Sequence, residues 1–200
     1  MNDKVMKAKV KCLLDKLKAL AYFHLKFINM LERPQAEEYP EYFQKYISKV
    51  PDGDLLKHLN LQRTEMLEFI NNLTPEQLSH KYAEDKWTVR QVLSHINDVE
   101  RIFGFRALAC LRNNAGDIPG FEQDDYVANT SMSKKTKKNL ADEFQACRNA
   151  NIHMIVSGEE SEWMRKCKIN GNETSARSMA YMLAGHVEHH KRLFAEKYFK

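Results

Sequence analysis

The sequence predicts an all-α protein that folds as a four-helix bundle with short auxiliary helices. Only 7 of the 200 residues are glycine and 5 are proline, which argues against a loop-rich all-β fold. Apolar residues recur at helical spacing over long stretches, and Ser or Thr residues suited to capping precede several of them. We find no strand-like alternation of any length and no internal repeat. Long helices joined by short connections bury their apolar faces best by packing against one another.

The first 29 residues are expected to be a basic extension, separate from a domain at residues 30–200. The extension has seven lysines against two aspartates, whereas residues 30–200 carry 24 basic and 25 acidic side chains. Residues 4–31 lack glycine and proline and predict an amphipathic helix that Pro34 ends. We interpret the extension as solvated or as the product of a misassigned start codon. The alternative is a basic helix that packs on the bundle, on a partner or on an anionic membrane surface.

The helices of the main domain follow from their caps and their apolar spacing. Thr74 and Thr88 each open a capping box, with Gln77 and Gln91 as the third helical residues. The segment 114–129 contains Gly and Pro and predicts a loop, and a short helix to about Cys167 precedes a polar turn at residues 170–172. The four long helices are predicted at residues 54–73, 88–113, 135–156 and 175–198.

Several classes of protein are disfavoured by composition. The longest uncharged stretch near the N-terminus, Ala19 to Leu25, is far shorter than the ~20 residues that span a bilayer, so we expect a cytoplasmic protein without a transmembrane segment. The nearly neutral charge of residues 30–200 gives no support to nucleic-acid binding. The cysteines lack a CxxC pair, and we expect them to be reduced thiols. They are Cys12, Cys110, Cys147 and Cys167.

The histidines of the last predicted helix differ in helical phase. At 100° per residue, His186 and His190 fall about 20° to either side of the centre of an apolar stripe, and His189 falls at its margin. Two imidazoles one turn apart on a buried face need hydrogen-bond partners or a shared cation, and this spacing lets both converge on one metal. Glu188 points to the opposite side. The motif is not HExxH, because Val187 stands where that motif needs Glu.

His95 is the candidate for a third metal ligand. It lies at the edge of the buried face of the helix at 88–113, and Arg106 shares that edge. Three histidines leave at least one coordination position open, which is typical of a catalytic metal site. Asp98 and Glu100 are candidates to orient the imidazoles, although a solvated helix face explains Asp98 equally well. By itself His95 is more typical of a hydrogen-bonded core histidine, and for the pair on the last helix both interpretations stay open.

Four segments together resemble the DinB/YfiT-like family, and the resemblance covers most of the chain from Met30 onward. They are MLERPQAEEYPEYFQKYISKVPDGDLL, KYAEDKWTVRQVLSHINDVERIFGFRAL, IPGFEQDDYV and AGHVEHHKRLFAEKY. The resemblance implies a four-helix bundle of the DinB/YfiT type, often a homodimer, with a divalent cation held by three histidines. Those positions correspond to His95, His186 and His190, which are the same three that helical phase selects.

The resemblance implies an enzyme but leaves its reaction open. We expect zinc or nickel at the site, and a small-molecule substrate. Some relatives resemble metal-dependent hydrolases, and others resemble S-transferases that use a thiol such as bacillithiol. The sequence offers no strong general base, which favours thiol transfer. The alternatives are a metal-dependent hydrolase and a non-catalytic, dimeric metal-binding bundle. Arg106 and Arg148 are candidates to hold an anionic group, and residues 118–127 are expected to line the entrance.

Overall fold

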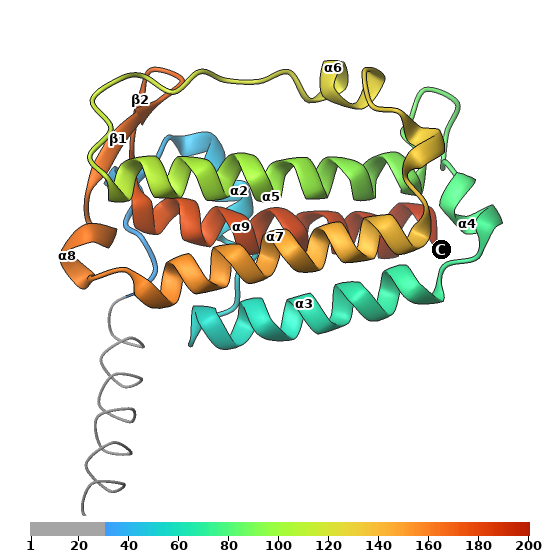
Figure 1. Cartoon of the computed structure of the whole chain (residues 1–200), viewed down its shortest axis with the longest axis horizontal. Coiled ribbons are helices and arrows are strands. Elements are labelled where there is room, and N and C mark those ends of the chain that lie inside the picture. The colour runs from blue at the N-terminus through green and yellow to red at the C-terminus, as the bar shows by residue number, and fades with distance from the viewer. Residues whose placement is uncertain (1–30) are drawn as a thin grey trace, which may run out of the picture.

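The protein is a four-helix bundle, as the sequence predicts. The structure is a computed structural model that describes residues 31–200, so the helix predicted within residues 4–31 lies outside the described part, apart from its last residue. No helix in residues 31–200 is both long and apolar enough to cross a membrane. The long helices lie side by side in Figure 1 and are α3 (Leu55–Asn72), α5 (Val89–Leu111), α7 (Lys137–Ser157) and α9 (Ala176–Leu193).

The four helices do not alternate in direction. Helices α3 and α9 run one way, and α5 and α7 run the other way (Figure 1). Because α5 and α7 are parallel, the chain between them must return along the whole length of α5, and this return segment carries α6 (Gln123–Ala128) and η3 (Met132–Lys134). Helix α5 packs against α9 and α7, and α6 lies against α5.

Short elements lie at the ends of the long helices and, in the case of α2, against the side of α9. Both predicted capping boxes are present, with Thr74 and Thr88 as the N-caps of α4 and α5. The short elements are η1 (Ala36–Glu38), η2 (Glu41–Phe43), α2 (Gln44–Ile47), α4 (Pro75–Ser79), α8 (Glu160–Trp163), β1 (Lys166–Ile169), β2 (Asn172–Ser175) and the π-helical turn η4 (Phe194–Tyr198).

A β-hairpin stands where the sequence analysis placed the end of a short helix, so that prediction is wrong. Helix α8 ends at Trp163, and β1 and β2 pair antiparallel with Ile169 opposite Asn172. The connecting residues Asn170 and Gly171 have φ angles of 51° and 76°, the positive values that a tight hairpin turn requires. The alternation that marks a strand is present in β1 but short, because its four residues alternate between exposed and buried only twice.

A disulfide joins Cys110 to Cys167, so the prediction that the cysteines are reduced is wrong for this pair. Cys110 is in the last turn of α5 and Cys167 is on β1. The hairpin packs on the end of α5 and brings their Cα atoms to 4.9 Å, within the usual range of a disulfide. Cys147 on α7 is a free thiol, and Cys12 lies outside the described residues.

The close packing of α2 on α9 depends on Gly185. A Cβ atom at this position would lie 2.4 Å from the carbonyl oxygen of Tyr46, which is backbone and cannot turn aside. The absence of a side chain therefore lets α2 approach α9. This approach places Tyr46 against the rings of His186 and His189, with centroid separations of 5.9 and 5.3 Å.

Replacing Gly185 with alanine should therefore destabilise the protein, although Ala is normally the better helix former. We expect Gly185→Ala to lower the free energy of unfolding by about 1–3 kcal/mol, because α2 must move away from α9. Urea unfolding measures this change. Gly116→Ala is the control, since the nearest atom to a Cβ there is a side-chain nitrogen at 3.8 Å, and it should change stability by less than ~0.5 kcal/mol. Stabilisation by Gly185→Ala would contradict the argument.

Candidate metal centre

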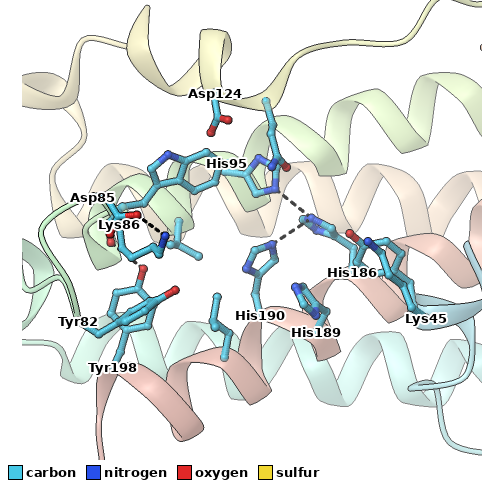
Figure 2. Close-up of a pocket in the computed structure, with 15 residues that line it drawn as sticks. Lys45, Tyr82, Asp85, Lys86, His95, Asp124, His186, His189, His190 and Tyr198 are labelled. Atoms are coloured by element: carbon cyan, nitrogen blue, oxygen red, sulfur yellow. Dashed lines mark hydrogen bonds and ion pairs between the residues drawn. The ribbon is translucent and has the colours of Figure 1, made fainter. Parts of the chain in front are cut away.

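The three histidines that the sequence singles out meet in the interior of the bundle. His95 comes from α5, and His186 and His190 come from α9, one helical turn apart (Figure 2). Nε2 of His186 lies 3.1 Å from Nε2 of His95 and 3.1 Å from Nε2 of His190. All three side chains are buried, and one ring nitrogen from each lies within 4.8 Å of the others. Within residues 31–200, no other three His, Cys, Asp or Glu side chains converge in this way.

Neighbouring aromatic rings hold the imidazoles in place. The ring of Trp87, which precedes the N-cap of α5, lies 5.1 Å from the ring of His95. The ring centroid of Phe103, two turns further along α5, lies 5.8 Å from that of His186.

Because α5 and α9 run in opposite directions, the early part of α5 faces the late part of α9 (Figure 1). This is how residues 91 positions apart come into contact.

The three imidazoles are neutral at neutral pH. Burial lowers the pKa of His95 to about 4 and holds the pKa values of His186 and His190 well below the usual range, and the neighbouring imidazoles lower them further. A neutral Nε2 atom offers either one proton or one lone pair. Nε2 of His186 faces two other Nε2 atoms, so hydrogen bonds among the three rings cannot satisfy all of them. A cation between the rings would accept a lone pair from each, so the donor set fits a transition metal.

The two carboxylates predicted beside the histidines lie elsewhere. Glu100 accepts hydrogen bonds from Arg148 and Asn151 on α7. Asp98 is half-buried, and burial raises its pKa, with Lys135 nearby opposing the shift. Within residues 31–200, neither carboxylate hydrogen-bonds to one of the three imidazoles, and Nδ1 of His190 is buried without a partner.

Arg148 lies at the centre of the bundle. Its side chain is completely buried, with Nε 3.0 Å and Nη2 2.5 Å from the two carboxylate oxygens of Glu100. Nη1 donates to Oε1 of Gln62 at 2.6 Å. Arg148 borders neither of the two cavities that meet at the histidines, so it would not touch a substrate bound in them.

Two cavities meet at the histidines. The first, of about 450 Å³, is here called the polar cavity and is shown in Figure 2. Its polar lining includes Lys45, Tyr82, Asp85, Lys86, Asp124 and His189. The second, of about 270 Å³, is here called the aromatic cavity and extends along α5 to Arg106. Its aromatic lining comprises Tyr42, Phe43, Tyr46, Phe103 and Phe121. Both are bordered by His95, His186 and Gln123, so the imidazoles form part of a shared wall.

The segment 118–127, predicted to line the entrance, borders both cavities. Phe121 contributes to the aromatic cavity, Asp124 to the polar cavity and Gln123 to both. Lys45 and Tyr46 also line the site, and no sequence signal marked them, because only the approach of α2 to α9 brings them there. His189 was placed at the margin of the apolar stripe, and that margin is where the polar cavity lies.

The fold and the site define a class: helical bundles with a buried three-histidine centre that opens onto cavities. The family model of the DinB superfamily matches residues 58–194, and the chain belongs to this superfamily. It is 27% identical, over 137 residues, to the Oceanobacillus iheyensis protein named "Putative metal-dependent hydrolase OB0413", a match that covers 68% of this chain and 78% of that protein. YfiT from Bacillus subtilis, described as a probable metal-dependent hydrolase with an unusual four-helix bundle topology, has a similar fold. Its TM-score is 0.57 at 15% identity, covering 84% of this chain and 97% of YfiT.

Proposed function

We propose that His95, His186 and His190 hold a divalent cation and that the protein is a metal-dependent enzyme acting on small molecules. The convergence of three neutral Nε2 atoms on the wall shared by two cavities carries this proposal. A cation held there would lower the pKa of a bound thiol or water, and the nucleophilic anion would then be available near neutral pH. Imidazole ligands suit zinc and nickel, which are the metals we propose.

We propose S-transfer from a low-molecular-weight thiol as the reaction. Two cavities that meet at the histidines suit two substrates, whose reacting atoms would come together at the shared wall. The polar cavity has two lysines and two aspartates in its lining, with Lys86 and Asp85 2.5 Å apart in an ion pair. This mixture of charges suits a thiol that carries both amine and carboxylate groups, as bacillithiol does. The aromatic cavity would then take the electrophile.

His189 is the side chain best placed to accept the proton of the thiol. It faces the polar cavity beside His190 (Figure 2). Burial, together with Lys49 and Lys45, lowers its pKa, so the imidazole is neutral at neutral pH and can take up a proton. The two carboxylates in the lining are exposed, and Asp85 is already paired with Lys86.

Hydrolysis is the second candidate function. It is supported by the names of the similar proteins from Oceanobacillus iheyensis and Bacillus subtilis, both of which refer to a metal-dependent hydrolase. Water would then replace the thiol as the nucleophile. A non-catalytic bundle would be expected to close the space around the histidines, and the two cavities disfavour it. The homodimer and the cytoplasmic location stay predictions.

A turnover assay with matched variants tests the proposal. Metal-loaded protein receives bacillithiol and 1-chloro-2,4-dinitrobenzene, or p-nitrophenyl acetate without thiol. We expect thiol-dependent turnover that falls by about 100-fold or more in His190→Ala, because one metal ligand is lost. Metal-dependent ester cleavage without thiol would favour the hydrolase instead. Equal rates for the wild type and His190→Ala with both substrates would overturn the enzymatic proposal.

A further inference from the structure

Arg106 is a buried cation that lacks a carboxylate partner. The residue is only 5% exposed. Nη2 donates to the carbonyl oxygen of Pro119 at 3.0 Å, and Nε is buried without any hydrogen-bond partner. The other buried arginines, Arg148 and Arg177, each bind a glutamate. Within residues 31–200, Arg106 forms no ion pair at all.

Arg106 lines the aromatic cavity, and two of the cavity's aromatic rings lie near its guanidinium. Its carbon lies 5.6 Å from the ring centroid of Phe121 and 5.9 Å from that of Phe103. Aromatic faces stabilise a guanidinium and fix its plane, but they leave its N–H groups without acceptors. Burial lowers the pKa of Arg106, yet an arginine stays charged in proteins. A buried charge without a counter-ion is unfavourable, so an anion that enters the cavity and pairs with it is stabilised.

We propose that the aromatic cavity binds a substrate with one carboxylate, held by Arg106, and with an apolar or aromatic body that lies along Phe103 and Phe121. This inference rests on the proposed function, in which the other end of that substrate reacts beside His95 and His186. Both ends belong to the same cavity, since Arg106 and His186 both line it. Phe103 lies between them and contacts each.

The helix sets the length of the substrate. Arg106 follows His95 by eleven residues on α5, so their Cα atoms are about 16 Å apart along the helix axis. The carboxylate and the reacting atom must therefore be several bonds apart, as in an aryl or unsaturated carboxylic acid that is electrophilic far from its carboxylate. The remaining cation in the lining, Lys45, lies at the end shared with the polar cavity. One isolated arginine suits a monoanion better than a phosphate.

Binding of an acid and its amide tests this inference. Cinnamate and the neutral cinnamamide are titrated into the full-length protein, both metal-loaded and after chelation, without thiol. Calorimetry gives the affinities, and the ¹⁵N–¹H signal of Arg106 Nε reports contact directly. We expect cinnamate to bind roughly 10- to 100-fold more tightly than the amide in both metal states, because charge-assisted hydrogen bonds form only with the acid. The Nε signal of Arg106 should shift when cinnamate is added and should not shift when cinnamamide is added.

Variants of Arg106 separate the guanidinium from the metal. Arg106→Met should lower the affinity for cinnamate to that for the amide. Arg106→Lys keeps the positive charge and should retain an intermediate affinity. It serves as the test if the methionine variant does not fold. Arg101→Met on the same helix is the control, since Arg101 is half exposed and should leave binding unchanged. Equal affinities for acid and amide would overturn the inference. So would cinnamate binding that chelation abolishes but Arg106→Met preserves, because the metal would then hold the carboxylate. The chelated arm stays informative even if no metal-dependent turnover is found.

Discussion

Protein purified without a histidine tag is expected to contain about one equivalent of a divalent transition metal, and the His186→Ala/His190→Ala variant is expected to contain none. The double substitution removes two of the three converging Nε2 atoms. His95 alone cannot hold an ion against competition from water and buffer. Elemental analysis by mass spectrometry after gel filtration measures the metal content.

His189→Ala is the matched control for this experiment. It removes an imidazole from the same helix and the same cavity, but His189 is outside the convergent group of three. We expect this variant to keep the metal. Circular dichroism verifies that both variants keep their helices. Metal retained by the double variant would disprove the site, and no metal in the wild type, even after incubation with Zn²⁺, Ni²⁺ and Mn²⁺, would favour the non-catalytic bundle.

Local sequence signals predicted the bundle well, because they act within one element. A threonine cap and an apolar period of 3.6 specify where α5 begins and which of its faces is buried, whatever the rest of the chain does. The same phase argument separated His186 and His190 from Glu188. Glu188 indeed faces away from the site and accepts a hydrogen bond from Gln62 on α3. Burial would raise its pKa, but the His58 imidazole 3.4 Å away, the hydrogen bond from Gln62 and the charge of Lys191 outweigh burial and lower the pKa to about 2.

Features that depend on distances between elements could not be predicted. The disulfide joins residues 57 positions apart, and only the packing of the hairpin on α5 brings them together. From the sequence, Arg106 and Arg148 were equal candidates to hold an anionic group. Their surroundings differ because Glu100 faces α7, where it pairs with Arg148. Arg106 instead faces the return segment, where its one hydrogen-bond partner among residues 31–200 is the carbonyl oxygen of Pro119.

A series of buried and half-buried polar contacts crosses the centre of the bundle. Glu188 on α9 accepts from Gln62 on α3 at 2.7 Å, Gln62 accepts from Arg148 on α7 at 2.6 Å, and Arg148 donates twice to Glu100 on α5. Each of the four long helices contributes one side chain. Low polarity around such contacts strengthens them when all members are present and penalises the loss of any one.

Removal of one partner from this series of polar contacts is expected to have the largest effect on stability. Glu100→Gln leaves the guanidinium of Arg148 buried without a counter-ion, so we expect the free energy of unfolding to fall by about 3–5 kcal/mol. Arg148→Met, which isolates the carboxylate of Glu100, should cost about as much. The double variant Glu100→Leu/Arg148→Met removes both charges and should be more stable than either single variant. Urea unfolding at pH 7 measures all three.

The exposed pair between the same two helices provides the control. Arg101 and Glu143 are 2.9 Å apart, but Arg101 is 51% exposed, so Arg101→Met should cost less than about 1 kcal/mol. A loss below 1 kcal/mol in Glu100→Gln, or additive losses in the double variant, would show that Arg148 and Glu100 are not coupled. Metal content distinguishes this structural role from the predicted role of Glu100 in orienting the imidazoles. Because Glu100 bonds to Arg148 and Asn151 and to none of the three histidines, the folded Glu100→Gln variant should still bind the metal fully.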